Sequence, residues 1–262
     1  GHLSLNALTG IGGTAANVAV GYGAAKGLVT GINNTVMGFN ALDAAVDNES
    51  YNVAIGADAM GACNQGSDAN SDIDGNVAIG YQALLGGNFG GSNKNANENV
   101  AIGYQAMDGS GAIDASNNVF VGSGAGGGTF ASELNTAVGI GSGALAGSLA
   151  STAGSTVAVG GSSLAALTSG AGNVAVGYQA ADAMTTGDAN TAVGYRALSA
   201  EDTGDGSVAV GYDALGLQAS DADEIAANTG VGKDAGYNNV LGQNNTYLGY
   251  KAGQGGTGSN SN

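Results

Sequence analysis

The stretch that decides the fold is NVAIGYQAL, Asn76–Leu84, because the chain repeats it almost unchanged. It returns as NVAIGYQAM at Asn99–Met107 and as NVAVGYQAA at Asn173–Ala181. An enzyme builds one site once, whereas a chain that repeats a short unit builds length or a repeated surface. The unit reads Asn, Val or Thr, a small residue, Val or Ile, Gly, Tyr, any residue, Ala, and then Leu, Met, Ala or Gly.

Thirteen copies of this unit are found, and successive copies never start closer than 17 residues, a spacing reached six times. A floor of this kind indicates a coil of minimum perimeter to which loops are added. The sequence therefore predicts an all-β fold, a β-solenoid or β-roll of about 13 coils with a 17-residue minimum period. The copies start at Asn17, Asn34, Asn52, Asn76, Asn99, Asn118, Asn135, Thr156, Asn173, Asn190, Ser207, Asn228 and Asn245.

The core segment of each copy alternates like a strand. In NVAVG, Val18 and Val20 point to one face and Ala19 points to the other. We expect the Val/Ile face to fill the interior of the coil, and the Ala face to let a second backbone come close. The following segment, YQAL in Tyr81–Leu84, is a candidate second strand.

Three positions of the unit have structural roles. The fifth residue is always glycine, which predicts a tight corner at positive φ, as at Gly80, Gly103, Gly177 and Gly194. The first residue, such as Asn76 or Asn99, suits an opposite corner and a ladder of stacked side-chain amides. The residue after the glycine, such as Tyr81 or Tyr104, predicts an aromatic ladder. This ladder either supports packing between coils or chains, which we favour, or forms a stripe on which carbohydrate stacks.

Composition excludes several classes of function. The 262 residues include 51 glycines, no proline, no tryptophan and only five basic residues, and the net charge is −16. Nucleic acid and anionic membranes are therefore poor partners, and no apolar run is long enough for membrane insertion. The single histidine, His2, excludes Ser-His-Asp machinery and a His-based zinc site. We predict that the chain is not an enzyme, although a carboxylate pair across two loops stays open.

The connecting segments hold 18 of the 21 acidic residues, so the candidate binding residues lie there. The two largest insertions are Gly61–Gly75 and Leu85–Glu98, and they make Phe89 and Lys94 candidate ligand contacts. Tyr51 and Tyr237 lie off the aromatic ladder and are further candidates.

Alternating oxygen ligands in the first insertion resemble the start of a calcium loop. They are Asp68, Asn70, Asp72 and Asp74. Ile73 occupies the glycine position of such a loop and no Glu closes it, so a solvated polar loop is the favoured interpretation and bound Ca²⁺ the alternative. No other cofactor is expected.

NVAIGYQAL, NVAVGYQAA and NTAVGYRAL (Asn190–Leu198) resemble the NTAVGYQAL-type repeats of phage tail fibres, which often precede an endosialidase-type intramolecular chaperone. The VAIG and VAVG cores also resemble the head repeats of YadA-like trimeric autotransporter adhesins, which form left-handed β-rolls. The phage type is favoured, because autotransporter coils are usually shorter than 17 residues and often carry Ser where this chain has Tyr. The resemblance implies a homotrimer.

These observations predict a structural and receptor-binding segment of a trimeric viral tail fibre. Its location would be extracellular, on the virion, and its loops would bind a host cell-surface glycan or protein. The alternative is a bacterial trimeric adhesin head on the cell surface that binds matrix or cells, and a weaker one is an ice-binding solenoid. The expected organisation is a cap or cloning remnant with a partial coil at 1–16, the β-roll at 17–253 and a polar tail at 254–262.

Overall fold

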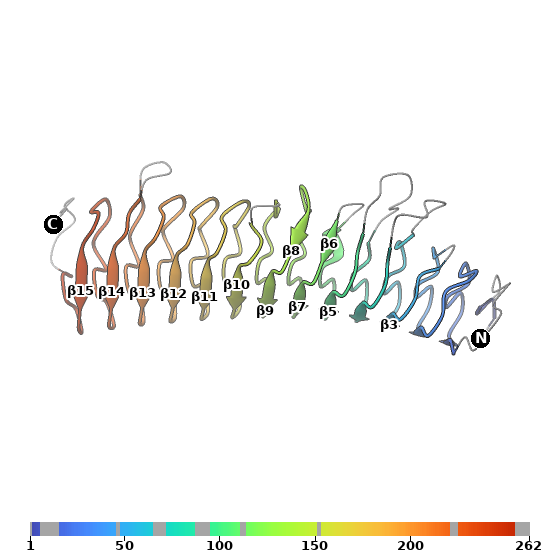
Figure 1. Cartoon of the computed structure of the whole chain (residues 1–262). Helices are drawn as coiled ribbons and strands as arrows, with labels where there is room; N and C mark the ends of the chain where they lie inside the picture. The colour runs from blue at the N-terminus through green and yellow to red at the C-terminus, as the bar shows by residue number, and fades with distance from the viewer. Residues whose placement is uncertain are drawn as a thin grey trace. The chain divides into compact units, whose positions relative to one another are not determined.

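The computed structural model describes residues 2–5, 16–45, 48–64, 72–86, 95–110, 114–150, 153–220 and 225–254. The chain divides into two compact units, Gly1–Thr136 and Ala137–Asn262. Within each unit, short strands lie side by side and run in the same direction (Figure 1). Since the sequence repeats across both units, the same local rules apply to each.

In the first unit, each repeat strand pairs in parallel with the strand of the next copy. These strands are β1 (Val18–Val20), β2 (Thr35–Met37), β3 (Val53–Ile55), β4 (Val77–Ile79), β5 (Val100–Ile102) and β7 (Val119–Val121). Two connecting segments form a second small sheet from β6 (Ala115–Ser116) and β8 (Leu134–Asn135). A 3-10 turn, η1, covers Asp108–Ser110.

The second unit repeats the arrangement, again in parallel register. Its strands are β9 (Val138–Ile140), β10 (Val157–Val159), β11 (Val174–Val176), β12 (Thr191–Val193), β13 (Val208–Val210), β14 (Thr229–Val231) and β15 (Thr246–Leu248). Every one of these strands has three residues. An isolated parallel bridge, Asp205 to Ile225, joins two connecting segments.

Each parallel pairing marks one complete turn of the chain, and the pairings number five in the first unit and six in the second. The protein is therefore an all-β parallel solenoid of about eleven turns with almost no helix. This confirms the predicted fold class. The count of 13 coils stays a prediction.

One copy of the repeat was assigned to the wrong starting residue. Strand β9 begins at Val138, which pairs with the first residue of β10. The copy placed at Asn135 therefore starts at Ala137, and its corner is Gly141 (φ +133°) rather than Gly139. The two extra residues precede the repeat unit, because an insertion inside the strand and corner would break the register of every neighbouring turn.

The glycine after each repeat strand has φ between +115° and +149°. A Cβ atom on Gly80 would lie 2.3 Å from the carbonyl oxygen of Gly103 in the next turn. The same distance separates a Cβ on Gly177 from the carbonyl oxygen of Gly194. Glycine is thus required both by the backbone conformation and by the close stacking of corners.

The segment after the corner is a series of turns, so the prediction of a second strand at Tyr81–Leu84 is wrong. Gln82 and Leu84 both adopt the left-handed conformation, with φ of +53° and +45°. With these two residues left-handed, their backbone amides point in opposite directions along the solenoid. The backbone N–H of Gln82 donates to the carbonyl of Ala57 in the preceding turn (3.0 Å), and the backbone N–H of Leu84 donates to the carbonyl of Ala106 in the following turn (2.8 Å).

The interior of the solenoid is the Ala face of the strands, which reverses the prediction that Val and Ile fill it. Ala54, Ala78 and Ala101 are completely buried, whereas Val18 and Val20 are half exposed. The physical reason is the narrow interior, in which the turn segment of the same coil approaches the strand closely. A methyl group fits between them, and the larger Val and Ile side chains point outward.

Two larger inner side chains show how tightly strand and turn face each other. Phe120 occupies the Ala position of β7 and is buried, and a Cβ on Gly126 would lie 2.6 Å from its ring. Tyr247 occupies the same position of β15, and a Cβ on Gly253 would overlap its ring. A large residue on the strand thus requires glycine at the last position of the repeat unit.

The buried asparagines that start the repeat form a ladder of amides. The Oδ1 of Asn76 accepts hydrogen bonds from the backbone N and the Nδ2 of Asn99, both at 3.0 Å. Asn99 Nδ2 also donates to the Ala115 carbonyl at 2.6 Å, and Asn99 Oδ1 accepts from the amide of Asn118 at 3.1 Å. Because all three asparagines are fully buried, these bonds satisfy groups that water cannot reach.

Ser207 stands where this ladder has asparagine, and Gln218 supplies the missing amide. Gln218 Nε2 donates to Ser207 Oγ at 2.9 Å, and its Oε1 accepts from Asn228 Nδ2 at 2.9 Å. The buried carboxylate of Glu201 accepts a further bond from Gln218 Nε2 at 2.7 Å. The polar network is thereby continued across the turn that begins with Ser207.

The single cysteine, Cys63, is buried in the interior, where its Sγ donates to the Leu84 carbonyl at 3.4 Å. Burial, together with the negative charge of Glu49, raises the pKa of the Cys63 thiol well above its usual range. Since the thiolate is the reactive form, we expect Ellman's reagent at pH 8 to modify the native thiol about 100-fold more slowly than the thiol of the urea-unfolded chain. A native rate within threefold of the unfolded rate would contradict the buried position.

Candidate binding surface

A second polar ladder runs along the connecting segments of the first unit, two residues before the first residue of each repeat unit. Ser50 donates its amide to Asp74 Oδ1 at 2.7 Å, and Asp74 donates its amide to Asn97 Oδ1 at 2.9 Å. Asn97 donates to Ser116 Oγ at 3.3 Å, and Ser116 donates to Asn135 Oδ1 at 2.9 Å. These side chains hold the connecting segments of neighbouring turns in fixed register.

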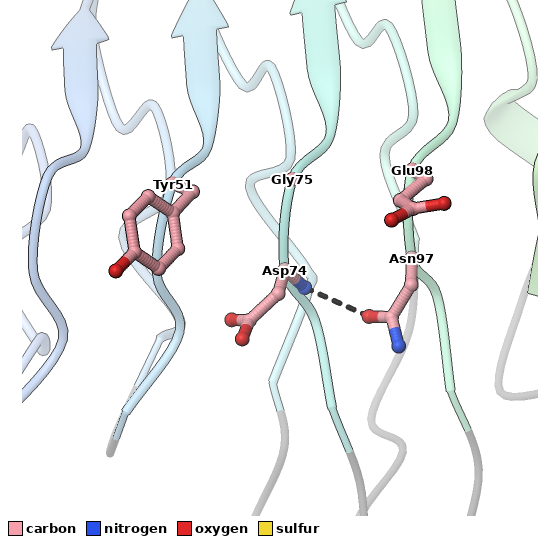
Figure 2. A pocket seen from close by; sticks show the side chains of 5 residues that line it. All are labelled: Tyr51, Asp74, Gly75, Asn97 and Glu98. Atoms are coloured by element: carbon pink, nitrogen blue, oxygen red, sulfur yellow. Dashed lines mark hydrogen bonds between the residues drawn. The ribbon is translucent and has the colours of Figure 1, made fainter.

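A depression of about 320 Å³ opens on this surface and is lined by Tyr51, Asp74, Gly75, Asn97 and Glu98. The residues come from three successive turns (Figure 2). Figure 2 shows the Tyr51 ring and the Glu98 carboxylate on either side of Gly75, with Asp74 below Gly75 and Asn97 below Glu98. The backbone beneath is stacked by regular bonds, since the Gly75 amide donates to the carbonyl of residue 50 and the Glu98 amide to that of Asp74.

The lining is acidic and carries one aromatic ring. Tyr51 is 58% exposed, so its ring is available to a ligand. Burial of the Asp74 carboxyl raises its pKa, while the bond from the Ser50 amide lowers it, and Asp72 and Glu49 raise it further. The depression therefore offers carboxylate acceptors beside an apolar ring.

A second, more polar depression of about 390 Å³ lies on the same unit. Its rim is built from the continuation of the polar ladder and from two carboxylates. The residues lining it are Asn95, Asp114, Ser116, Asn117, Glu133 and Asn135. It has no aromatic side chain and offers less apolar contact than the Tyr51 depression.

Of the four residues named as the alternative Ca²⁺ loop, Asp68 and Asn70 lie outside the described residues. The backbone amide of Asp74 donates to Asn97 Oδ1 within the ladder, and the backbone amide of Asp72 donates to Asn95 Oδ1 in the same way, both at 2.9 Å. In the described part of the chain, no three His, Cys, Asp or Glu residues are grouped so that they could hold a metal ion.

Two of the four predicted ligand contacts, Tyr51 and Tyr237, lie among the described residues. Phe89 and Lys94 lie outside the described residues. Tyr51 lines the depression in the first unit, whereas Tyr237 lies in the second unit and is half-buried against Gly216, where a Cβ would come within 3.0 Å of its ring. It was not predicted from the sequence that Asn97 and Glu98 line the depression. Both stand just before a ladder asparagine, as Tyr51 and Gly75 do.

The tyrosines that follow the corner glycines form stacked pairs and triplets. Ring centroids are 5.5 Å apart for Tyr81 and Tyr104, 5.6 Å for Tyr178 and Tyr195, and 5.0 Å for Tyr195 and Tyr212. The rings are nearly parallel, with interplanar angles from 11° to 22°. Within each stack, the rings cover the facing sides of their neighbours. This geometry favours packing over the alternative in which sugars stack on the ladder.

Comparison with protein-family models, with curated proteins and with solved structures gives no match to this chain. Among the described residues, no helix has the length and apolar character needed to cross a bilayer.

Proposed function

We propose that this chain is a structural and receptor-binding segment of a homotrimeric viral tail fibre, which acts outside the cell. The resemblance of the repeats to phage tail fibres supports the class. The observation that carries the trimer is the outward Val/Ile face of the parallel sheets. Three chains pack through this face, and their connecting segments remain free to bind a host cell surface.

The outward face is apolar and has the regular spacing that a second copy requires. In the second unit, the outward positions of every strand carry Val, Ile, Leu or Thr and no charged residue. Val174 and Val176 are 36% and 37% exposed, and Leu248 is 76% exposed. Parallel sheets are normally covered on both faces, and a contiguous apolar strip of this kind marks an interaction surface.

A copy of the same chain is the partner that this strip fits best. Its rows recur once per turn, at about 4.8 Å, so an identical strip matches it row for row. The net charge of −16 disfavours contact between chains through their acidic connecting segments, whereas the strip is uncharged. The number three is taken from the resemblance.

Val176→Asp is the variant that tests the trimer. We expect the wild-type chain to have a solution mass of about three times 24.8 kDa by light scattering on a sizing column. Val176→Asp should have the mass of one chain and keep its β-sheet circular dichroism, because it places carboxylates in an apolar interface without touching the interior.

The matched control adds the same charge elsewhere in the same turn. Ala183 is exposed in the connecting segment after β11, so Ala183→Asp should stay trimeric. A wild-type mass of one chain, or a Val176→Asp mass equal to that of the wild type, would exclude the proposed interface.

A further inference from the structure

One row of side chains on the first unit projects outward at every turn. It consists of the residues directly before the first residue of each repeat unit, all in the left-handed conformation with φ between +57° and +70°. Their neighbours in the row are about 4.8 Å away, one turn up and one turn down. The row is Asn33, Tyr51, Gly75, Glu98, Asn117 and Thr136.

The depression exists because Gly75 leaves this row open between Tyr51 and Glu98. A Cβ on Gly75 would meet the Glu98 side chain at 3.5 Å, so any side chain here would extend into the opening. The ring of Tyr51 has no aromatic neighbour within the described residues, unlike the stacked tyrosines of the ladder. The opening is therefore bounded by an uncovered ring on one side and a carboxylate on the other (Figure 2).

The polar groups around the opening have unused hydrogen-bonding capacity. Asp74 uses Oδ1 to accept from the Ser50 amide, which leaves Oδ2 for a ligand. Asn97 uses its Oδ1 to accept from the Asp74 amide, which leaves two N–H donors on Nδ2. Within the described part of the chain, the Glu98 carboxylate and the Tyr51 hydroxyl make no hydrogen bond. Acceptors thus outnumber donors around one apolar ring.

We propose that Tyr51, Asp74, Asn97 and Glu98 bind one neutral hexopyranose residue of a host surface glycan in the opening beside Gly75. This inference rests on the proposed receptor-binding function and names its ligand class. The apolar face of the sugar packs on the Tyr51 ring, as expected for a ring that is both apolar and exposed. Sugar hydroxyls donate to Asp74 and Glu98 in charge-assisted bonds, and Asn97 Nδ2 donates to a sugar oxygen.

The charge of the opening selects against other sugars. Sialic acid and uronic acids would bring a carboxylate next to Asp74 and Glu98, where like charges repel. The volume of about 320 Å³ is at the small end of ligand pockets, so it holds one sugar residue with its waters rather than a long oligosaccharide. A single site of this size binds weakly, and three copies in one fibre strengthen attachment through multivalency.

Gly75→Asn tests the site without disturbing the fold. Asparagine already occupies the equivalent positions Asn33 and Asn117 at the same φ, so the backbone accepts it while its side chain fills the opening. Gly172→Asn is the matched control, because Gly172 (φ +66°) is the equivalent residue of a turn in the second unit and has nothing within 4 Å of a Cβ.

The measurement is saturation-transfer NMR of the intact chain with methyl glycosides. The neutral probes are the methyl glycosides of glucose, galactose, mannose, fucose, rhamnose, N-acetylglucosamine and N-acetylgalactosamine. The charged probes are those of sialic acid and glucosamine. Ca²⁺ is added separately as a competitor. We expect transfer to at least one neutral glycoside in the wild type and in Gly172→Asn, and its loss in Gly75→Asn. Tyr51→Asn should weaken the affinity about tenfold, because it removes the ring and keeps a residue suited to positive φ.

Three results would overturn the proposal: no transfer to any neutral glycoside, unchanged transfer in Gly75→Asn, or binding of glucosamine or Ca²⁺ alone. Attachment of the labelled chain to host cells is measured separately. If the wild type attaches and Gly75→Asn attaches equally well, the sugar site is wrong and the fibre function stands. If the wild type attaches to no host, the fibre function itself fails.

Discussion

Gly177→Ala is expected to lower the free energy of unfolding by about 4 kcal/mol or more. Its Cβ would lie 2.3 Å from the carbonyl oxygen of Gly194 and 2.6 Å from its carbonyl carbon. Neither atom can yield, because both belong to the backbone of the next corner. The φ of +140° is also strained for any residue with a Cβ. Urea unfolding followed by circular dichroism measures the change.

Gly172→Ala, five residues earlier in the same turn, separates the two causes. Gly172 has φ of +66°, but a Cβ there meets nothing within 4 Å. We expect it to cost about 1 kcal/mol, the penalty for a left-handed residue alone. Equal shifts in the two variants would show that the overlap between corners has no energetic consequence, which would contradict the close stacking of the turns.

Asn99→Ala is expected to cost about 3 kcal/mol, because it removes the partners of groups that water cannot reach. The amide of Asn118 loses its acceptor at 3.1 Å, and the carbonyl of Ala115 loses its donor at 2.6 Å. Each buried group left without a bond costs roughly 1–3 kcal/mol. The ladder also passes through Asn99 to Asn76, so the loss should loosen the neighbouring turns as well as its own.

Asn95→Ala is the matched control, since Asn95 is the same residue type in the connecting segment before that turn. Its Oδ1 accepts one bond from the amide of Asp72, at an exposed position where water can replace it. We expect a cost below about 1 kcal/mol. If Asn99→Ala and Asn95→Ala shifted the urea midpoint equally, burial of the ladder would not explain the asparagine of the repeat.

The solenoid could be predicted from the repeat, because the residue requirements of each turn depend only on that turn and its two neighbours. A glycine at a fixed place in every copy shows that one backbone position needs positive φ or close approach, and both hold at Gly80. The strand itself follows from the three-residue alternation. These properties depend on one turn and its neighbours, so a single sequence contains them.

The alternation of Ala and Val could not show which face of each strand points into the interior, because both residues are apolar. Two other copies of the repeat contain the signal that does show it. NVFVGSGAG (118–126) and NTYLGYKAG (245–253) have an aromatic residue at the Ala position, and both end in glycine where most other copies have a larger residue. Phe120 and Tyr247 require Gly126 and Gly253 opposite them, so these positions face each other across the interior.

The candidate site was predicted only in part for a different reason. Tyr51 was found because an aromatic residue off the ladder stands out in one sequence. Asp74 was assigned to a calcium loop by its local spacing, whereas the structure places it beside Glu98, which is 24 residues away. Insertions between copies hide which connecting residues share a row, and stacking of the turns reveals it.

The row that contains Tyr51 has a consequence for how such a protein changes over generations. At this position the backbone requires only a left-handed residue, and Asn, Tyr, Gly, Glu and Thr all meet that requirement in the first unit. The exposed side chain of each turn can therefore change by a single substitution, while the corner glycines, the asparagine ladder and the interior stay the same. Substitutions in this row can therefore change the exposed surface of the solenoid without changing the residues that stabilise its fold.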